Sequence, residues 1–312
     1  MGNKKARAFR RKRYSLLQEI KKFVILKKKE AIALNQTEKT IVITGASDGI
    51  GKAAAKQLCA LGHKVVIVGR NPEKTKKAAE ELGVPYHLCD YADLSQVKRL
   101  AKELSAYEKI DVLANNAGGL QTALAKTKDG FDKTFQVNLL GGLLLTLLLL
   151  DKLAESRATV IQTSSIASNL YGADFDRTDL QNERARSVRK AYGYSKLEDA
   201  LITRELQKRY GAKGIAAVAF EPGVAKTNFA WDAKGFLRVA YHSPLRHLFT
   251  ISPETSAKRL TRLAIGEPNV DFIPGELYSY EKLYKLKFRD PDGKIAEEFF
   301  DDCLALLRPY LD

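Results

Sequence analysis

The sequence predicts an α/β fold in which a doubly wound, parallel sheet is covered by helices on both faces. Three observations predict it. Short β-branched runs alternate with helical segments along the chain, these runs are apolar throughout, and glycines follow the first of them. Strands buried on both faces have this uniform composition, whereas a strand with one wet face alternates. Right-handed crossovers then place a ligand at the carboxyl ends of the strands.

Each element is assigned from the same pattern. The first strand, TIVIT at 40–44, leads through a glycine turn into a helix at 50–61. A helix at 72–82 begins with proline. At the first position of a helix the backbone N–H has no partner within the helix, so the lack of an N–H in proline costs nothing there. The remaining strands are expected at 64–68, 84–89, 110–114, 159–163 and 215–220. The remaining helices are expected at 94–107, 131–153, 191–210 and 294–307.

The composition suits a folded core in a reducing compartment. Apolar residues make up 45% of the 312 positions, and the three scattered cysteines form no Cys-x-x-Cys pair. The four histidines are far apart in the sequence, so no metal site is expected. The apolar run at 137–150 is shorter than the roughly 20 residues that span a bilayer, so we expect a buried helix there.

Residues 1–38 are expected to form a basic arm, separate from a domain at 39–312. Of the net charge of +15, residues 1–39 carry +10, from thirteen lysines and arginines against three glutamates. Two interpretations stay open, a solvated tail and a helix lying on an anionic membrane surface, while nucleic-acid binding is not expected. The longest apolar run of the arm, 23–26, is too short for a secretory signal. The sequence therefore favours a cytoplasmic protein that can associate with membranes.

The first strand ends in a turn typical of dinucleotide-binding proteins. The segment TGASDGIG at 44–51 places Gly45, Gly49 and Gly51 where backbone amides can approach a pyrophosphate. The helix that starts at Gly49 and Ile50 directs its unpaired N–H groups and its positive end at the anion. A strand before the glycines and a helix after them are the context that gives the motif this meaning.

The end of the second strand favours NADP(H). An acidic residue near this point would bind the ribose hydroxyls of NAD(H), but the sequence has Arg70, which suits a 2′-phosphate. Ser47 can add a hydrogen-bond donor. Asp48 argues in the other direction, since its charge would repel the same phosphate. NAD(H) therefore stays the alternative cofactor.

Three motifs together resemble the short-chain dehydrogenase/reductase family: TGASDGIG, Asp90 after the third strand, and Asn-Asn-Ala-Gly at 115–118. The resemblance covers about residues 39–265 and implies a Rossmann fold that binds NADP(H) or NAD(H). It implies that Asp90 contacts the adenine and that the turn with Asn116, Ala117 and Gly118 supports the sheet beside the cofactor. It also implies that four further residues contact the carboxamide end of the nicotinamide: Pro222, Gly223, Val224 and Thr227.

A tyrosine and a lysine four residues apart, Tyr192 and Lys196, share one face of a predicted helix. An ammonium beside a phenol favours the phenolate, so we expect Lys196 to lower the pKa of Tyr192. The family resemblance implies the roles. Tyr192 exchanges a proton with the substrate oxygen, and Lys196 also holds the nicotinamide ribose. Ser165 hydrogen-bonds the carbonyl oxygen, and Asn138 anchors a water in a proton relay.

A second pair with the same spacing is formed by Tyr278 and Lys282. These two residues lie beyond the sixth expected strand, and neither a serine-bearing strand nor a long helix accompanies them. We therefore predict that they take no part in catalysis.

The region between Ser165 and Tyr192 is long, because these residues are 27 positions apart. A similar insert is found in the branch that resembles retinol dehydrogenases and protochlorophyllide reductases, which implies a bulky, lipophilic substrate. A substrate loop is expected at 223–252 and a C-terminal cap over the substrate side at 268–312. The candidate pocket walls are Leu170, Tyr171, Phe175, Phe229, Trp231, Phe236 and Tyr241.

The sequence thus predicts an NADP(H)-dependent oxidoreductase that interconverts a carbonyl and an alcohol on a lipophilic small molecule. The alternative is a catalytically silent nucleotide-binding sensor or scaffold, which the loss of a catalytic residue would signal, and none of the four is lost. The expected partners are the small-molecule substrate, a membrane surface contacted by residues 1–38, and a second copy of the chain in a homo-oligomer.

Overall fold

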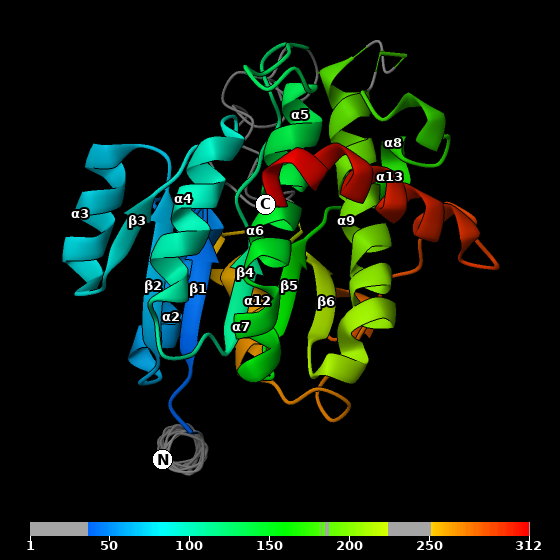
Figure 1. Cartoon of the computed structure of the whole chain (residues 1–312). Coiled ribbons are helices and arrows are strands. Elements are labelled where there is room, and N and C mark those ends of the chain that lie inside the picture. Colours follow the sequence, from blue (N-terminus) through cyan, green and yellow to red (C-terminus); the bar gives the residue numbers. More distant parts are fainter. Residues whose placement is uncertain (1–36, 182, 185–186, 224–250, 312) are drawn as a thin grey trace, which may run out of the picture. The chain divides into compact units, whose positions relative to one another are not determined.

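A computed structural model describes residues 37–181, 183–184, 187–223 and 251–311. Residues 39–312 form one compact unit, and residues 1–36 of the basic arm lie outside the described residues. The described strands are β1 (Thr40–Thr44), β2 (Lys64–Gly69), β3 (Tyr86–Leu88), β4 (Val112–Asn115), β5 (Thr159–Thr163), β6 (Ala216–Glu221), β7 (Leu277–Ser279) and β8 (Lys282–Leu283). They form one sheet in the order β3-β2-β1-β4-β5-β6-β7-β8. Figure 1 shows the first six of these, from β3 to β6, side by side. Neighbouring strands are parallel except β7 and β8, which are antiparallel.

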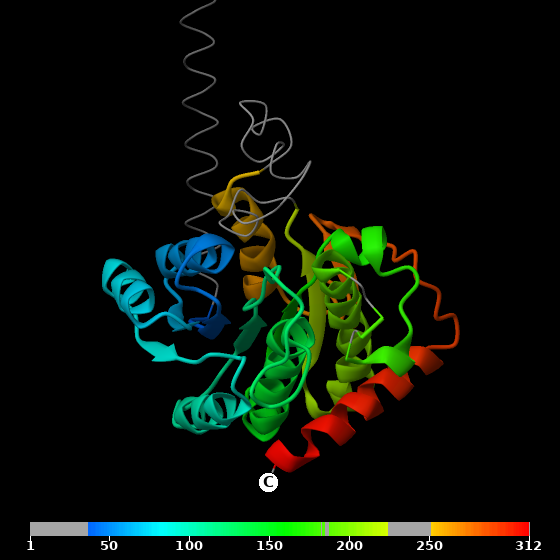
Figure 2. The same ribbon diagram turned by 90° about the horizontal axis from the view of Figure 1, so that it is seen from above.

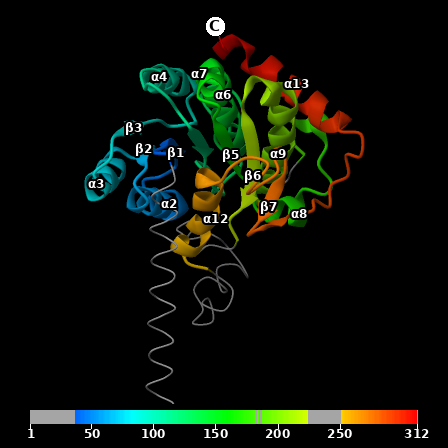
Figure 3. The ribbon, with the colours of Figure 1, turned by 90° about the horizontal axis from the view of Figure 1, so that it is seen from below.

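Helices cover both faces of this sheet. The described α-helices are α2 (Gly49–Ala60), α3 (Pro72–Leu82), α4 (Leu94–Ser105), α5 (Lys133–Phe135), α6 (Gly141–Leu148), α7 (Leu150–Glu155), α8 (Ala167–Tyr171), α9 (Val188–Tyr210), α12 (Pro253–Ile265) and α13 (Lys294–Leu311). Figures 2 and 3 show α2, α3 and α12 on one side of the sheet and α4, α6 and α9 on the other. The predicted three-layer, doubly wound Rossmann fold is confirmed.

The apolar strands follow from this double cover. Along β1, Ile41 and Ile43 pack into the core beneath α2 and α12, while Val42 packs into the core beneath α4 and α6. All three side chains are fully buried. Because successive side chains of a strand point to opposite faces, a strand with a helical layer on each side must be apolar at every position.

Side-chain caps fix where the helices begin. Asp48 accepts from the Gly49 amide at the start of α2, and Asn71 accepts from the third residue of α3. Ser187 accepts from the Lys190 amide, so α9 begins three residues before the expected position 191. Such caps satisfy N–H groups that have no partner inside the helix, each worth about 1 kcal/mol.

The structure divides the helix predicted at 131–153. The short α5 is followed by a π-helical turn, Gln136–Leu140, and then by α6 and α7. The apolar run predicted to be a buried helix is buried, and its leucines belong to the main core. Within the described residues, no helix is both long enough and apolar enough to cross a bilayer.

The C-terminal region extends the sheet and one helical layer. β7 extends the sheet beyond β6, where no strand was predicted, and three residues are too few for a sequence pattern. α13 packs against α9, α6 and α4, on the outside of one helical layer, through Phe299, Phe300 and Cys303 (Figure 2). The apolar face of α13 is thus used by the core, and the cap over the substrate side at 268–312 stays a prediction.

Candidate active site

The glycine turn lies at the point where the order of the strands reverses. β1 has β2 on one side and β4 on the other, and the helices that follow β1 and β4 lie on opposite faces of the sheet. In folds of this kind such a reversal leaves a crevice at the carboxyl end of the sheet, where ligands bind. Gly45 has φ +65°, and a Cβ there would lie 2.7 Å from Ala117 Cα. A Cβ at Gly51 would lie 2.6 Å from the Gly45 oxygen. The two turns pack so closely that only glycine fits at either position.

Hydrogen bonds tie the same two turns together. The Thr44 hydroxyl oxygen accepts from the amides of Asn116 and Ala117, each at 3.0 Å. The Asn116 side-chain amide donates to the Thr44 carbonyl at 2.9 Å and to the Gly45 carbonyl at 3.3 Å. Asn116 and Ala117 therefore hold the glycine turn in shape through contacts within the protein.

The start of α2 suits a dinucleotide. Gly49 has φ +59°, and its amide donates to the capping side chain of Asp48. The next amides, those of Ile50 and Gly51, belong to the first turn of the helix, where an N–H has no intrahelical partner and an anion is stabilised. The left-handed backbone at Gly45 and Gly49 and the first-turn amides of α2 suit a pyrophosphate, so the residues present fit the predicted cofactor.

The residues expected at the adenosine end lie on neighbouring strand ends. A Cβ at Gly69 would lie 3.0 Å from Ser47 Cβ, which places Ser47 beside the end of β2. Arg70 follows directly and is exposed. The Cys89 amide donates to the Gly69 carbonyl at 3.0 Å, so Asp90 is next to the same edge. Asp90 also accepts from the Ala92 amide at 3.0 Å, which holds its carboxylate in place.

The structure brings Tyr192, Lys196 and Ser165 together. Lys196 Nζ lies 5.7 Å from the centroid of the Tyr192 ring, and the Ser165 side chain hydrogen-bonds that of Tyr192. Ser165 comes from the turn after β5, and the other two from the first turns of α9. A hydroxyl, a phenol and an ammonium thus converge at the carboxyl end of the sheet.

Lys196 is fixed by partners that the motif does not contain. Its Nζ donates to the Thr163 carbonyl oxygen at 2.8 Å and to Asp199 Oδ2 at 2.8 Å. Asp199 was not predicted as a site residue, although its spacing from Lys196 is readable in the sequence. Burial alone would lower the pKa of Lys196, but the carboxylate of Asp199 raises it overall.

The pKa of Tyr192 does not follow the expected direction. Burial raises it above its ordinary value, and the Asp199 carboxylate adds to the rise. The Lys196 ammonium and the Ser165 hydrogen bond act in the opposite direction, as predicted, but do not outweigh burial. In this form of the protein the phenol therefore keeps its proton at neutral pH, which suits a proton donor.

Asn138 connects the turn after β4 to α9. Its side-chain oxygen accepts from the Gly119 amide at 2.8 Å, and its side-chain nitrogen donates to the Ser195 hydroxyl at 3.0 Å. A Cβ at Gly118 would lie 3.0 Å from that oxygen. Asn138 lies inside the π-helical turn, a geometry that frees backbone groups from the regular ladder and recurs at functional sites.

The turn after β6 is held by a buried acidic residue. Glu221 accepts from the Gly223 amide at 2.8 Å and from Arg259 at 2.8 Å, and also hydrogen-bonds the Ser279 hydroxyl. Gly223 has φ +77°. Pro222 and Gly223 are thus positioned at the carboxyl end of β6, whereas Val224 and Thr227 lie outside the described residues.

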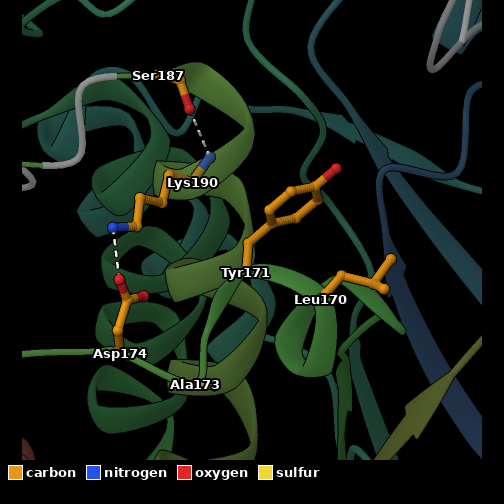
Figure 4. Close-up of a pocket in the computed structure, with 6 residues that line it drawn as sticks. All are labelled: Leu170, Tyr171, Ala173, Asp174, Ser187 and Lys190. Atoms are coloured by element: carbon orange, nitrogen blue, oxygen red, sulfur yellow. Dashed lines mark hydrogen bonds and ion pairs between the residues drawn. The ribbon is translucent and has the colours of Figure 1, made fainter. Parts of the chain in front are cut away.

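A pocket of about 440 Å³ adjoins the start of α9 (Figure 4). It is lined by Leu170, Tyr171, Ala173, Asp174, Ser187 and Lys190. In Figure 4 the side chains of Leu170 and Tyr171 extend to one side, and the ion pair of Lys190 and Asp174 lies on the other. Tyr171 packs on Gly193, the neighbour of Tyr192, because a Cβ at Gly193 would lie 2.4 Å from Tyr171 Cβ.

Not all the aromatic residues expected in the pocket walls lie there. Phe175 is 9% exposed and packs edge-on against Tyr194, Phe288 and Phe299, so its assignment to the pocket was wrong and it belongs to the core. The rings that bury Phe175 include Phe299 of α13 and Phe288 of the segment before it. Their position next to Phe175 cannot be read from the sequence. Four other expected walls lie outside the described residues: Phe229, Trp231, Phe236 and Tyr241.

Tyr278 and Lys282 lie on neighbouring strands of the sheet, and not on one helix like Tyr192 and Lys196. They belong to β7 and β8, two strands of a hairpin, and so share no helix face. The Tyr278 hydroxyl is occupied by the Ile273 amide at 2.9 Å.

A doubly wound sheet with a glycine turn at its switch point, and a tyrosine, lysine and serine beside it, defines a nucleotide-dependent oxidoreductase. The family model of the short chain dehydrogenases matches residues 39–176. Retinol dehydrogenase 12 of Mus musculus is 41% identical over 279 residues, covering 86% of this chain and 86% of that protein. Retinol dehydrogenase 13 of Homo sapiens is 36% identical over 282 residues, covering 86% and 84%. The chain therefore belongs to the short-chain dehydrogenase/reductase family, in its retinol dehydrogenase-like branch.

A solved structure agrees with this placement. A protein from Mycobacterium paratuberculosis is 28% identical and superposes with a TM-score of 0.67, covering 88% of this chain and 97% of that chain. The similarity thus extends over nearly the whole domain and well beyond the part matched by the family model.

Proposed function

We propose that the protein interconverts a carbonyl and an alcohol on a lipophilic small molecule, with NADP(H) as its cofactor. The observation that carries the proposal is the convergence of Tyr192, Lys196 and Ser165 at the end of the sheet where the glycine turn lies. Asn138, the fourth residue of the expected set, joins the β4 turn to the same helix. With the set complete, a catalytically silent scaffold is not favoured.

The site residues have separate roles in proton transfer, in stabilising negative charge and in binding the cofactor. A bound nicotinamide supplies or accepts the hydride. In reduction, the Tyr192 hydroxyl donates a proton to the oxygen that becomes the alcohol, and Ser165 donates a hydrogen bond to that oxygen as negative charge develops on it. Lys196 has three N–H donors, of which Thr163 and Asp199 take two, leaving one for a ribose hydroxyl. Asn138 would anchor a water that returns a proton to Tyr192.

The preference for NADP(H) rests on Arg70. It is exposed at the end of β2, beside Ser47, where a 2′-phosphate would sit and where a guanidinium can form paired hydrogen bonds. Replacing Arg70 with leucine should raise the KM for NADPH about tenfold and leave the KM for NADH nearly unchanged. A wild-type chain that uses NADH at least as well as NADPH would contradict this part of the proposal.

A lipophilic substrate is supported by the pocket beside α9 and by the relatives. Leu170 is 61% exposed and Tyr171 is 37% exposed, and both line this pocket. The similar proteins are named for retinol, an apolar alcohol. We propose a substrate whose reacting carbon carries a long apolar group, with all-trans-retinal as the first compound to test.

The test compares aldehydes of increasing apolar length with NADPH in the full chain. We expect kcat/KM to rise from propanal to decanal and all-trans-retinal, and Ser165→Ala to lower kcat at least a hundredfold. No turnover on any of these compounds would overturn the proposed activity. A preference for the shortest aldehyde would overturn the substrate class alone.

Membrane contact by residues 1–38 is proposed from charge alone, because residues 1–36 lie outside the described part of the chain. Lys27, Lys28 and Lys29 form a basic run directly after the apolar segment at 23–26. Their joint replacement by glutamate should abolish co-sedimentation with vesicles rich in anionic lipid while leaving turnover of a soluble aldehyde intact. Equal sedimentation of both chains would remove the idea.

A further inference from the structure

The lysine of the proposed catalytic group has a buried carboxylate partner. Asp199 lies about one helical turn after Lys196 and two after Tyr192, so the three residues occupy one side of α9. The side chains of Lys196 and Asp199 are 6% and 3% exposed, and their charged atoms are 2.8 Å apart. The Thr163 carbonyl on β5 binds the same ammonium at 2.8 Å. Lys196 is therefore held between the helix and the sheet.

Burial makes this ion pair different from one on the surface. Water and salt screen exposed pairs strongly, but they cannot enter between Lys196 and Asp199. Any group close enough to sense the lysine therefore also senses the aspartate. Tyr192 is such a group, with its ring centroid 5.7 Å from Lys196 Nζ. The two charges act on the pKa of Tyr192 in opposite directions, since Lys196 lowers it and Asp199 raises it.

We propose that Asp199 is a positioning residue, which holds the Lys196 ammonium in place and offsets part of its charge at Tyr192. Carbonyl reduction then continues to higher pH than it would beside an uncompensated lysine. This inference rests on the proposed function, because it takes Tyr192 as the proton donor. Reduction requires the protonated phenol of Tyr192, whereas alcohol oxidation requires the phenolate. Asp199 therefore helps to set the pH above which oxidation is favoured over reduction.

The other groups that face this pair leave Asp199 as the charge that matters. Glu198, the next residue back along α9, also interacts with Asp132 at the start of α5 and with Cys303 on α13. Burial and the carboxylates of Asp199 and Asp132 raise the pKa of Glu198 well above its ordinary value, so its charged form is disfavoured. From the β5 side, the Thr163 carbonyl and the Ser165 hydroxyl face the group, and neither titrates near neutral pH.

Asp199 itself is ionised in the relevant range. Burial raises its pKa to about 6, against the opposing effect of Lys196. Above about pH 7 it therefore carries its negative charge. The comparison with a neutral variant starts at pH 7 and continues beyond pH 10, because the pKa of Tyr192 is raised above its ordinary value of about 10.

The test replaces Asp199 by asparagine, which keeps an oxygen acceptor for Lys196 and removes the charge. Glu198→Gln is the matched control, since it changes the adjacent buried carboxyl, which is not among the groups that shift the pKa of Tyr192. For each chain, kcat/KM for aldehyde reduction is measured against pH. The ionisation of Tyr192 is followed separately, without turnover, by phenolate absorbance as the difference between each chain and its Tyr192→Phe counterpart.

The proposal predicts that Asp199→Asn moves the phenolate titration, and the falling limb of reduction, about one pH unit lower, while Glu198→Gln moves neither. On the falling limb this is about a tenfold loss of rate at fixed pH. An unshifted titration in Asp199→Asn, even with a lower rate at every pH, would overturn it, because a purely structural role predicts that result. Asp199→Ser is read in the same way if the asparagine variant does not fold. A shifted phenolate titration in a chain without aldehyde turnover would uphold the inference and refute the proposed activity.

Discussion

Gly45 and Gly83 form a matched pair for testing the packing of the glycine turn. Their φ angles are +65° and +66°, so an alanine at either position adopts the same unfavourable left-handed backbone. That conformation costs an alanine about 1–2 kcal/mol relative to glycine. At Gly83, the end of α3, a new Cβ would meet nothing within 4 Å. At Gly45 it would lie 2.7 Å from Ala117 Cα and 3.0 Å from Ala117 N.

The difference between the two variants isolates the close approach of the β1 and β4 turns. Ala117 presents backbone atoms, which cannot rotate away as a side-chain tip can, so the turns must separate. Overpacking of this kind costs about 1–3 kcal/mol beyond the backbone term. We therefore expect Gly83→Ala to lower the free energy of unfolding by about 1–2 kcal/mol and Gly45→Ala by about 2–5 kcal/mol.

Urea unfolding measures both free energies by linear extrapolation, and NADPH binding is measured by the change in its fluorescence. Gly45→Ala should weaken NADPH binding at least tenfold, because the turn that faces the pyrophosphate is displaced. Gly83→Ala should leave binding unchanged. Equal losses of stability, or NADPH binding that survives Gly45→Ala intact, would refute the claim that this crevice is built on the contact between the two turns.

Two further predictions concern buried and exposed side chains. Both carboxylate oxygens of Glu198 are buried and have no hydrogen-bond partner among the described residues, so Glu198→Met should stabilise the fold by about 1–3 kcal/mol at pH 7. Folding raises the pKa of Glu198, so the contribution of Glu198 to the free energy of unfolding is fully present below about pH 4.5 and is lost as the pH rises. The stability advantage of the methionine variant should therefore grow from pH 5 to 8. An advantage independent of pH would contradict this. Phe175→Ala should lower the free energy of unfolding by about 3–5 kcal/mol, because the side chain is buried. Leu170→Ala should lower it by under about 0.5 kcal/mol and should raise the KM for all-trans-retinal. Similar melting temperatures of the two variants would contradict the assignment of Phe175 to the core.

The sequence predicts the first half of the domain well because its signals there are local. The strand at 40–44 is apolar on both faces, and its glycines are needed within the turn itself. The same holds for Tyr192 and Lys196, whose spacing alone puts them on one side of a helix. In each case the relevant contact is between residues a few positions apart, or is dictated by the backbone.

The features that escaped prediction depend on distant parts of the chain. Phe175 resembles a pocket residue until α13 supplies the aromatic surface that buries it. The spacing of Lys196 and Asp199 is that of any exposed helical ion pair, and only the packing of α9 on the sheet makes it a buried one. The same burial reverses the net direction of the pKa shift of Tyr192. Desolvation is set by the tertiary fold, and no motif contains it.

The central claim is that Tyr192 is the acid and base of a nucleotide-dependent reaction. Tyr192→Phe removes one oxygen atom and leaves the ring against Lys196, so it tests the phenol and little else. We predict that this variant binds NADPH with a Kd within about threefold of the wild-type value and reduces all-trans-retinal at least a hundredfold more slowly. Turnover within threefold of wild type, with NADPH still bound, would contradict the account.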